Sequence, residues 1–213
     1  MKIKVCGLRE SENIQEAAKL DIQFMGFIFH QRSKRYVGNT LNRKLIKNLP
    51  THIKKTAVFV NERSEDILWT LKDYDFDYIQ CHGDETPQYC QDLKDLGFGI
   101  IKAFQMDEHF DFTQLEAYKT AVDYFLFDTS SKHYGGSGQK FDWSILENYK
   151  GETPFFLSGG IQAEDAYCIQ QLSHPKLVAV DINSGFEDKP GLKDIDLIET
   201  FSEKVKEITV KQS

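Results

Sequence analysis

Short apolar runs recur along the chain and alternate with longer polar segments. Each run has three to six residues and is rich in Val, Ile and Phe. Runs of this length and composition are typical of buried β-strands and are too short for helices. The eight runs are Ile3–Cys6, Phe24–Phe29, Thr56–Val60, Tyr78–Cys81, Ile100–Phe104, Tyr124–Phe127, Phe155–Leu157 and Leu177–Ile182.

The segments between the runs carry apolar residues three and four positions apart, as amphipathic helices do. Examples are SENIQEAAKL, SEDILWTLKDY and TPQYCQDLKDLG. Ser11, Ser64 and Thr86 stand where helix N-caps are expected, and Gly97 stands where a helix would end. The pattern therefore predicts a helix after each strand.

Strands joined by helices run parallel, because the helix returns the chain to the starting edge of the sheet. Eight such units without a linker in 213 residues predict an α/β fold, a (β/α)8 TIM barrel that forms a single domain over residues 1–213. The alternative is an open, doubly wound sheet. That fold usually shows a G-x-G-x-x-G loop after its first strand, and CGLRE follows Val5 here.

Composition narrows the classes of partner. The net charge is −7 and Lys and Arg form no large cluster, which argues against nucleic-acid and anionic-membrane binding. No apolar run approaches the roughly 20 residues that span a bilayer, and no signal peptide is recognisable, so a cytoplasmic location is expected. The four cysteines form no C-x-x-C pair, which favours free thiols over a zinc site or a disulfide framework.

Polar residues and glycines stand at the ends of several predicted strands or directly after them. In a closed parallel barrel these ends form one rim, and active sites lie there. The residues are Cys6, Arg35, His82, Asp128, Ser158, Gly159, Gly160, Asp181, Asn183, Ser184 and Gly185. The glycine-rich stretches HYGGSGQKFDW, FLSGG and DINSG follow strands six, seven and eight. Glycine turns after the last two strands are where such barrels bind phosphate.

Each of these residues also has a purely structural interpretation. Buried strand cysteines are usually inert, and we assign Cys81, Cys90 and Cys168 to that class. Asp128 could cap the next helix, and Arg35 could be a solvated loop charge. His82 could be a barrel-interior histidine rather than a substrate contact. Lys4 and Asp181 lie on adjacent closing strands and could form only a buried ion pair.

The order of the motifs resembles that of the phosphoribosylanthranilate isomerase family of tryptophan biosynthesis. The matching stretches are KIKVCGL, MGFIFHQRSKRYV, AVFVNE, IQCHGDE, FLFDT, GGSGQKFDW, FLSGG and VDINSGFEDKPGLKD, from Lys2 to Asp194. The resemblance implies a (β/α)8 barrel that uses no cofactor and no metal. It implies an Amadori rearrangement of N-(5′-phosphoribosyl)anthranilate to 1-(2-carboxyphenylamino)-1-deoxyribulose 5-phosphate.

Residue by residue, the resemblance puts the family's general base on Cys6 and its general acid on Asp128. It puts the arginine that holds the anthranilate carboxylate on Arg35. It puts the phosphate-binding backbone on Gly159-Gly160 and Ser184-Gly185. We expect His82, Asp181 and Asn183 to contact the substrate as well. The chain departs from the family pattern at Arg9, Cys81 and Asn183, where Thr, Leu and a small residue are usual.

The reaction needs one acid for the sugar ring oxygen and one base for the C2′ proton. Lys4 lies two residues before Cys6, hence on the same strand face, and its ammonium is expected to favour the thiolate. Two other functions compete. Another phosphosugar enzyme, such as a ribulose-phosphate epimerase or an indole-glycerol-phosphate synthase, would need metal ligands or a Lys–Glu pair at the strand ends. A non-catalytic phosphometabolite-binding protein would need no acid and base. A monomer is expected, with a homodimer as the alternative.

Overall fold

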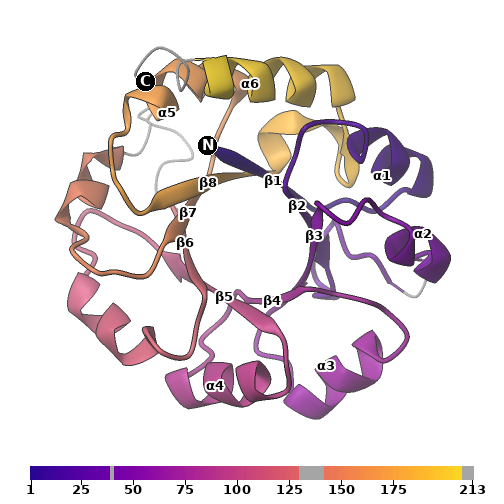
Figure 1. Ribbon diagram of the computed structural model, residues 1–213, viewed down its shortest axis with the longest axis horizontal. Coiled ribbons are helices and arrows are strands. Elements are labelled where there is room, and N and C mark those ends of the chain that lie inside the picture. Colours follow the sequence, from indigo (N-terminus) through magenta and orange to yellow (C-terminus); the bar gives the residue numbers. More distant parts are fainter. Residues whose placement is uncertain (39–40, 130–141, 208–213) are drawn as a thin grey trace.

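The computed structural model describes residues 1–38, 41–129 and 142–207. Eight parallel strands close into a barrel in chain order, and β8 pairs with β1. The strands are β1 (Lys2–Cys6), β2 (Phe24–Ile28), β3 (Lys54–Phe59), β4 (Tyr78–Cys81), β5 (Gly99–Gln105), β6 (Tyr124–Asp128), β7 (Phe155–Ser158) and β8 (Leu177–Ile182). Figure 1 shows this ring of strands with the helices outside it. The predicted (β/α)8 barrel is confirmed, and the open sheet is wrong.

The helices cover the outside of the barrel (Figure 1). A short antiparallel hairpin follows β8. The α-helices are α1 (Ser11–Ala17), α2 (Arg43–Lys47), α3 (Ser64–Leu71), α4 (Pro87–Asp95), α5 (Ala166–Gln171) and α6 (Ile195–Glu207). The 3-10 helices are η1 (Phe112–Tyr118), η2 (Trp143–Asn148), η3 (Ala163–Asp165) and η4 (Ser184–Phe186), and the hairpin strands are β9 (Glu187–Lys189) and β10 (Leu192–Lys193). None of the described helices is long and apolar enough to cross a membrane.

A helix follows each strand as predicted, but the helices after β5 and β6 are of the 3-10 type. The segments η1 and η2 are 3-10 helices, and an aspartate precedes each of them. The Asp111 side chain accepts from the backbone N–H of Thr113, and Asp142 does the same for Ser144, both at 2.9 Å. These bonds cap the first N–H groups of each 3-10 helix.

The helix ends follow the predicted signals in part. Thr86 caps α4, because its side chain accepts from the backbone N–H of Tyr89, and Gly97 follows that helix with φ +96°. Ser11 and Ser64 are instead the first helical residues of α1 and α3, and no side chain caps these helices. The predicted caps at these two positions are therefore wrong by one residue.

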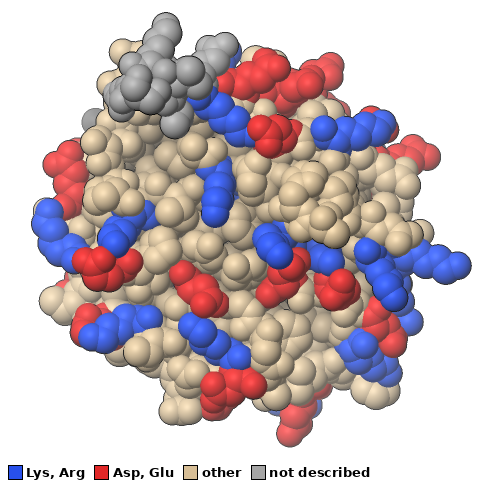
Figure 2. Space-filling view, in the orientation of Figure 1, with Lys and Arg blue, Asp and Glu red and all other residues tan. Residues whose placement is uncertain are grey.

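Two apolar layers share the strands. Phe24, Ile101, Leu126 and Phe156 fill the inside of the barrel together with Ala103 and Ala179, and the rings of Phe24 and Phe156 are 5.0 Å apart. Alternate residues face outward into the larger core under the helices. Apolar side chains fill this part of the barrel interior. The inward-facing polar groups of the site lie beyond it, at the carboxyl ends of the strands. On the face seen in Figure 2, positive and negative side chains are interspersed rather than gathered by sign.

Candidate active site

A cavity of about 360 Å³ opens at the carboxyl ends of the strands. All predicted site residues except Gly185 line it: Cys6, Arg35, His82, Asp128, Gly159, Gly160, Asp181, Asn183 and Ser184. Ile28, Val58 and Val60 supply apolar wall. The barrel therefore brings together groups that are far apart in the sequence.

Cys6 ends β1, and its side chain has room because its neighbour in β2 is a glycine. Cys6 pairs with Gly26 in the strand register, and a Cβ at Gly26 would lie 2.8 Å from the Cys6 Sγ. Cys6 itself is 4% exposed. The next residue, Gly7, has φ +78°, a conformation that favours glycine. The two glycines thus fix where the thiol sits at the rim.

The Lys4 ammonium lies below the thiol and is paired with Asp181. The Nζ–Oδ1 distance is 2.8 Å, and both side chains are buried, so the predicted ion pair is confirmed. Burial raises the pKa of the Cys6 thiol, the cations of Lys4 and Lys193 oppose this effect, and the Asp181 carboxylate adds to it. The resting thiol is therefore protonated. The expectation that Lys4 would favour the thiolate holds in direction, but burial outweighs it.

The raised pKa predicts a distinct alkylation profile. Iodoacetamide reacts with thiolate, so its rate at Cys6 should be low at neutral pH and rise as pH increases. We expect the Cys6 rate to keep rising above about pH 8.5, where the rate at the ordinary exposed thiol of an added peptide levels off. Peptide mass spectrometry after timed quenching measures both rates in one sample. A Cys6 rate that levels off at the same pH as that of the added peptide would contradict the effect of burial on Cys6.

Asp128 ends β6 and faces His82 across the rim. The Asp128 Oδ2 lies 3.5 Å from the Nε2 of His82, and the His82 Nδ1 lies 2.7 Å from the Nε2 of Gln80. Gln80 is 1% exposed, so it anchors the histidine ring from inside the barrel. The structural interpretation of His82 as a barrel-interior histidine is incomplete, because the ring is held by a buried partner and also lines the cavity.

Two glycine turns lie at the cavity, after β7 and after β8. Gly159 and Gly160 follow β7 with φ +98° and +64°, and Ser184 and Gly185 begin η4 after β8. Within the described chain, the N–H groups of these four residues donate no hydrogen bond. Thr129, which sequence reasoning missed, fixes the first turn by donating from Oγ1 to the carbonyls of Ser158 and Gly159. Of the glycine-rich stretch HYGGSGQKFDW, residues 133–141 lie outside the described residues.

Gly185 lies behind this turn rather than in the cavity wall. A Cβ at Gly185 would lie 2.3 Å from the carbonyl oxygen of Ile161. The absence of a side chain therefore lets η4 pack closely against the loop after β7.

Arg35 is not a solvated loop charge, so that structural interpretation is wrong. Its guanidinium donates to the carboxylate of Glu187, which is buried at 4% side-chain exposure, while the Arg35 side chain is 19% exposed. Sequence reasoning missed Glu187 and its second partner, Lys193. Both fall within the family-like stretch VDINSGFEDKPGLKD, but no local pattern there indicates a contact with residue 35.

The three departures from the family pattern each have a defined environment. Arg9 donates from Nη1 to the carbonyl of Lys34, which links the loops after β1 and β2. Cys81 is buried against Cys90, which together with burial raises the pKa of Cys81. The Oδ1 of Asn183 accepts from Lys193 at 2.8 Å. Of these three, only Asn183 lines the cavity.

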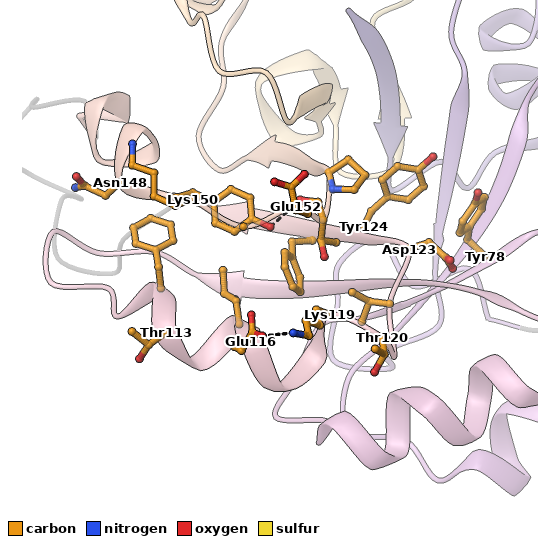
Figure 3. Close-up of a pocket in the computed structure, with 18 residues that line it drawn as sticks. Tyr78, Thr113, Glu116, Lys119, Thr120, Asp123, Tyr124, Asn148, Lys150 and Glu152 are labelled. Atoms are coloured by element: carbon orange, nitrogen blue, oxygen red, sulfur yellow. Dashed lines mark hydrogen bonds and ion pairs between the residues drawn. The ribbon is translucent and has the colours of Figure 1, made fainter.

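A larger hollow of about 1250 Å³ lies at the opposite rim, near the start of β6 (Figure 3). Tyr78, Asp123, Tyr124 and Glu152 are among the residues that line it, and Lys119 pairs with Glu116 in its wall. It contains none of the predicted site residues. The larger hollow therefore lacks the polar groups of the strand ends, which gather in the smaller cavity.

Comparison with known proteins agrees with this architecture. The family model described as N-(5′-phosphoribosyl)anthranilate (PRA) isomerase matches residues 3–204. An N-(5′-phosphoribosyl)anthranilate isomerase of Parabacteroides distasonis is 48% identical over 206 residues, covering 96% of this chain and 93% of the relative. The enzyme of the same name from Caldanaerobacter subterraneus is 41% identical, covering 97% and 98%.

Solved structures with a similar fold include members of the same family. A phosphoribosyl anthranilate isomerase structure from Thermotoga maritima matches with a TM-score of 0.85 and 31% identity, covering 97% of this chain and 98% of that one. Another such isomerase, solved with reduced 1-(o-carboxyphenylamino)-1-deoxyribulose 5-phosphate, matches with a TM-score of 0.83 and 28% identity, covering 97% and 98%. The family match spans nearly the whole chain. This chain belongs to the N-(5′-phosphoribosyl)anthranilate isomerase family.

Proposed function

We propose that the protein converts N-(5′-phosphoribosyl)anthranilate to 1-(2-carboxyphenylamino)-1-deoxyribulose 5-phosphate in tryptophan biosynthesis, with Cys6 as general base and Asp128 as general acid. One observation carries this proposal. A single cavity holds a thiol, a carboxyl group, a guanidinium and a turn with unpaired backbone N–H groups. These groups match the C2′ proton, the ring oxygen, the anthranilate carboxylate and the phosphate of that substrate.

The chemistry proceeds in three steps. Asp128 gives its proton to the furanose ring oxygen as the C1′–O bond breaks, and the anilino nitrogen lone pair forms the Schiff base. The Cys6 thiol first gives up its proton to solvent, and the resulting thiolate takes the C2′ proton, while the C2′–H electron pair moves toward the iminium nitrogen to give an enolamine. The enolamine takes up a proton at C1′ as its 2′-hydroxyl gives one up, which forms the ketone with no net change in protons. A buried thiol that ionises with difficulty is a strong base once ionised, which suits removal of a proton from carbon.

The direct test is turnover. Purified protein is mixed with freshly prepared phosphoribosylanthranilate, and loss of the anthranilate fluorescence is followed. Rapid loss that depends on enzyme concentration supports the proposal. A protein that binds the phosphorylated substrate without consuming it would contradict the isomerase and support the non-catalytic alternative.

The phosphate site predicts a binding defect from a change at Gly160. A side chain there would occupy open space at the cavity that Gly160 lines, because no atom lies within 4 Å of a Cβ built at this position. We expect Gly160→Val to raise KM about tenfold and to weaken the competitive inhibition by inorganic phosphate, with a smaller effect on kcat. Initial-rate kinetics with and without phosphate measure this.

Gly97→Val is the matched control. Gly97 also has a positive φ and open surroundings, but it ends α4 and does not line the cavity. The control should suffer similar backbone strain and keep its KM. Equal KM values for the wild type and Gly160→Val would contradict the phosphate assignment.

A further inference from the structure

Arg35, the proposed receptor of the substrate carboxylate, is held by a buried acid from the other end of the chain. The Arg35 Nε lies 2.8 Å from Oε1 and 2.9 Å from Oε2 of Glu187, and Nη2 lies 2.5 Å from Oε2. These contacts occupy one edge of the guanidinium. Within the described residues Nη1 donates to no group, so the second edge remains for a ligand.

Glu187 is itself fixed by further donors. Its Oε1 accepts from Lys193 Nζ at 2.8 Å and from the backbone N–H of Gly191 at 3.0 Å. Burial tends to raise the pKa of Glu187, but the hydrogen bonds from Arg35 and Lys193 outweigh it and the pKa is lowered. The carboxylate is therefore ionised, as a partner for Arg35 must be.

Lys193 adds a second positive charge to the ion pair of Arg35 and Glu187. Its side chain is fully buried, and its Nζ also contacts the backbone oxygen of Asn183 at 3.1 Å and the Oδ1 of Asn183 at 2.8 Å. Two cations and one carboxylate leave one net positive charge beside the cavity. Without Lys193, the Glu187 carboxylate would neutralise Arg35 and would repel an anionic ligand.

The stem of Arg35 is confined as well. A Cβ at Gly7 would lie 2.6 Å from the Arg35 Cδ and 2.8 Å from the Asn183 Oδ1. The arginine therefore passes directly over the turn that follows Cys6. Its side chain is restricted by packing at the stem and by two hydrogen-bonded atoms at the head.

We propose that Glu187, balanced by Lys193, is a positioning residue that presets Arg35 to receive the ring carboxylate of the substrate. The proposal rests on the function proposed above for Arg35. A guanidinium that is already ordered loses less side-chain freedom when the carboxylate binds. The entropic cost of binding is therefore smaller, and the affinity for the carboxylate is higher. Glu187 thereby contributes to the selection of an arylamine that carries a carboxylate over one that lacks it.

The test compares Glu187→Gln with the wild type, using two ligands. One is the reduced product analogue with its ring carboxylate, and the other is the same analogue without that carboxylate. We expect Glu187→Gln to bind the first about tenfold more weakly and the second as the wild type does, with KM raised and kcat changed little. If Glu187 instead competes with the substrate for Arg35, Glu187→Gln would bind the carboxylated analogue more tightly, and the proposal would be overturned.

A double-mutant comparison shows whether the effect passes through Arg35. In the background of Arg35→Met, adding Glu187→Gln should cause no further loss of affinity for the carboxylated analogue. An undiminished further loss would mean that Glu187 acts by another route and would overturn the proposal. Glu187→Asp keeps the charge but shortens the reach, and a KM between those of the wild type and Glu187→Gln is expected.

Asp123→Asn provides the matched control. Asp123 pairs with Lys94 and accepts from the backbone of Ile100 at the opposite rim, so its loss should leave ligand binding unchanged. The two proposals fail in different ways. No turnover by the wild type would refute the proposed function. If the wild type turns over substrate and Arg35→Met has a raised KM, but Glu187→Gln binds the analogue normally, only the role of Glu187 is refuted.

Discussion

Asp128→Asn is expected to lower kcat for phosphoribosylanthranilate roughly 10³-fold, within the range of a lost general acid, and to change KM little. The amide keeps the shape of the carboxyl group and can still face His82, whose Nε2 lies 3.5 Å from the Asp128 carboxylate. It cannot give a proton to the ring oxygen. The loss therefore appears in the transition state and not in the bound ground state. Single-turnover fluorescence kinetics measure it.

Arg35→Met is the contrasting variant for this experiment. Arg35 is proposed to bind the carboxylate throughout the reaction, so its loss should raise KM strongly, with some loss of kcat if the contact also positions the sugar. A product analogue should bind normally to Asp128→Asn and poorly to Arg35→Met. The opposite pattern, with binding abolished by Asn at position 128 and unaffected by Met at position 35, would show that both roles are wrong.

Cys6→Ser is expected to reduce kcat roughly 10²-fold or more while the fold and substrate binding are retained. Serine is smaller than cysteine, so its side chain fits the space beside Gly26. That space is tight, since a Cβ built at Gly26 would lie 2.8 Å from the Cys6 Sγ. A serine hydroxyl ionises far less readily than a thiol and is a poor base here. The ratio of kcat values, with circular dichroism to verify folding, gives the result.

Cys168→Ser is the control for the loss of a thiol. Cys168 is exposed on α5 and does not line the cavity, so this variant should retain full activity. Near-normal turnover by Cys6→Ser would mean that another group removes the C2′ proton.

Much of the barrel was predictable because its signals are local. Apolar runs such as Tyr78–Cys81 and Leu177–Ile182 match β4 and β8 residue for residue. Parallel strands that are buried on both faces are largely apolar, and this property can be read from neighbouring residues in the sequence. The helices were less predictable, since apolar residues three and four positions apart do not distinguish the 3-10 pairing of η1 and η2 from α-helical pairing.

The sequence by itself also determined which side chains stand at the rim, since a strand's direction and its last residue place Cys6 and Asp128 there. Only the tertiary structure decided what surrounds them. Closure of β8 onto β1 brings Glu187 to Arg35 across 152 positions of the chain, and the β1–β2 register sets Gly26 beside Cys6. The periodicity of apolar residues indicates which face of a helix or strand is buried. The hydrogen-bond partners and protonation states of the site residues depend instead on contacts between distant segments. The physical reason is that charge pairing and desolvation arise only when those segments are packed together.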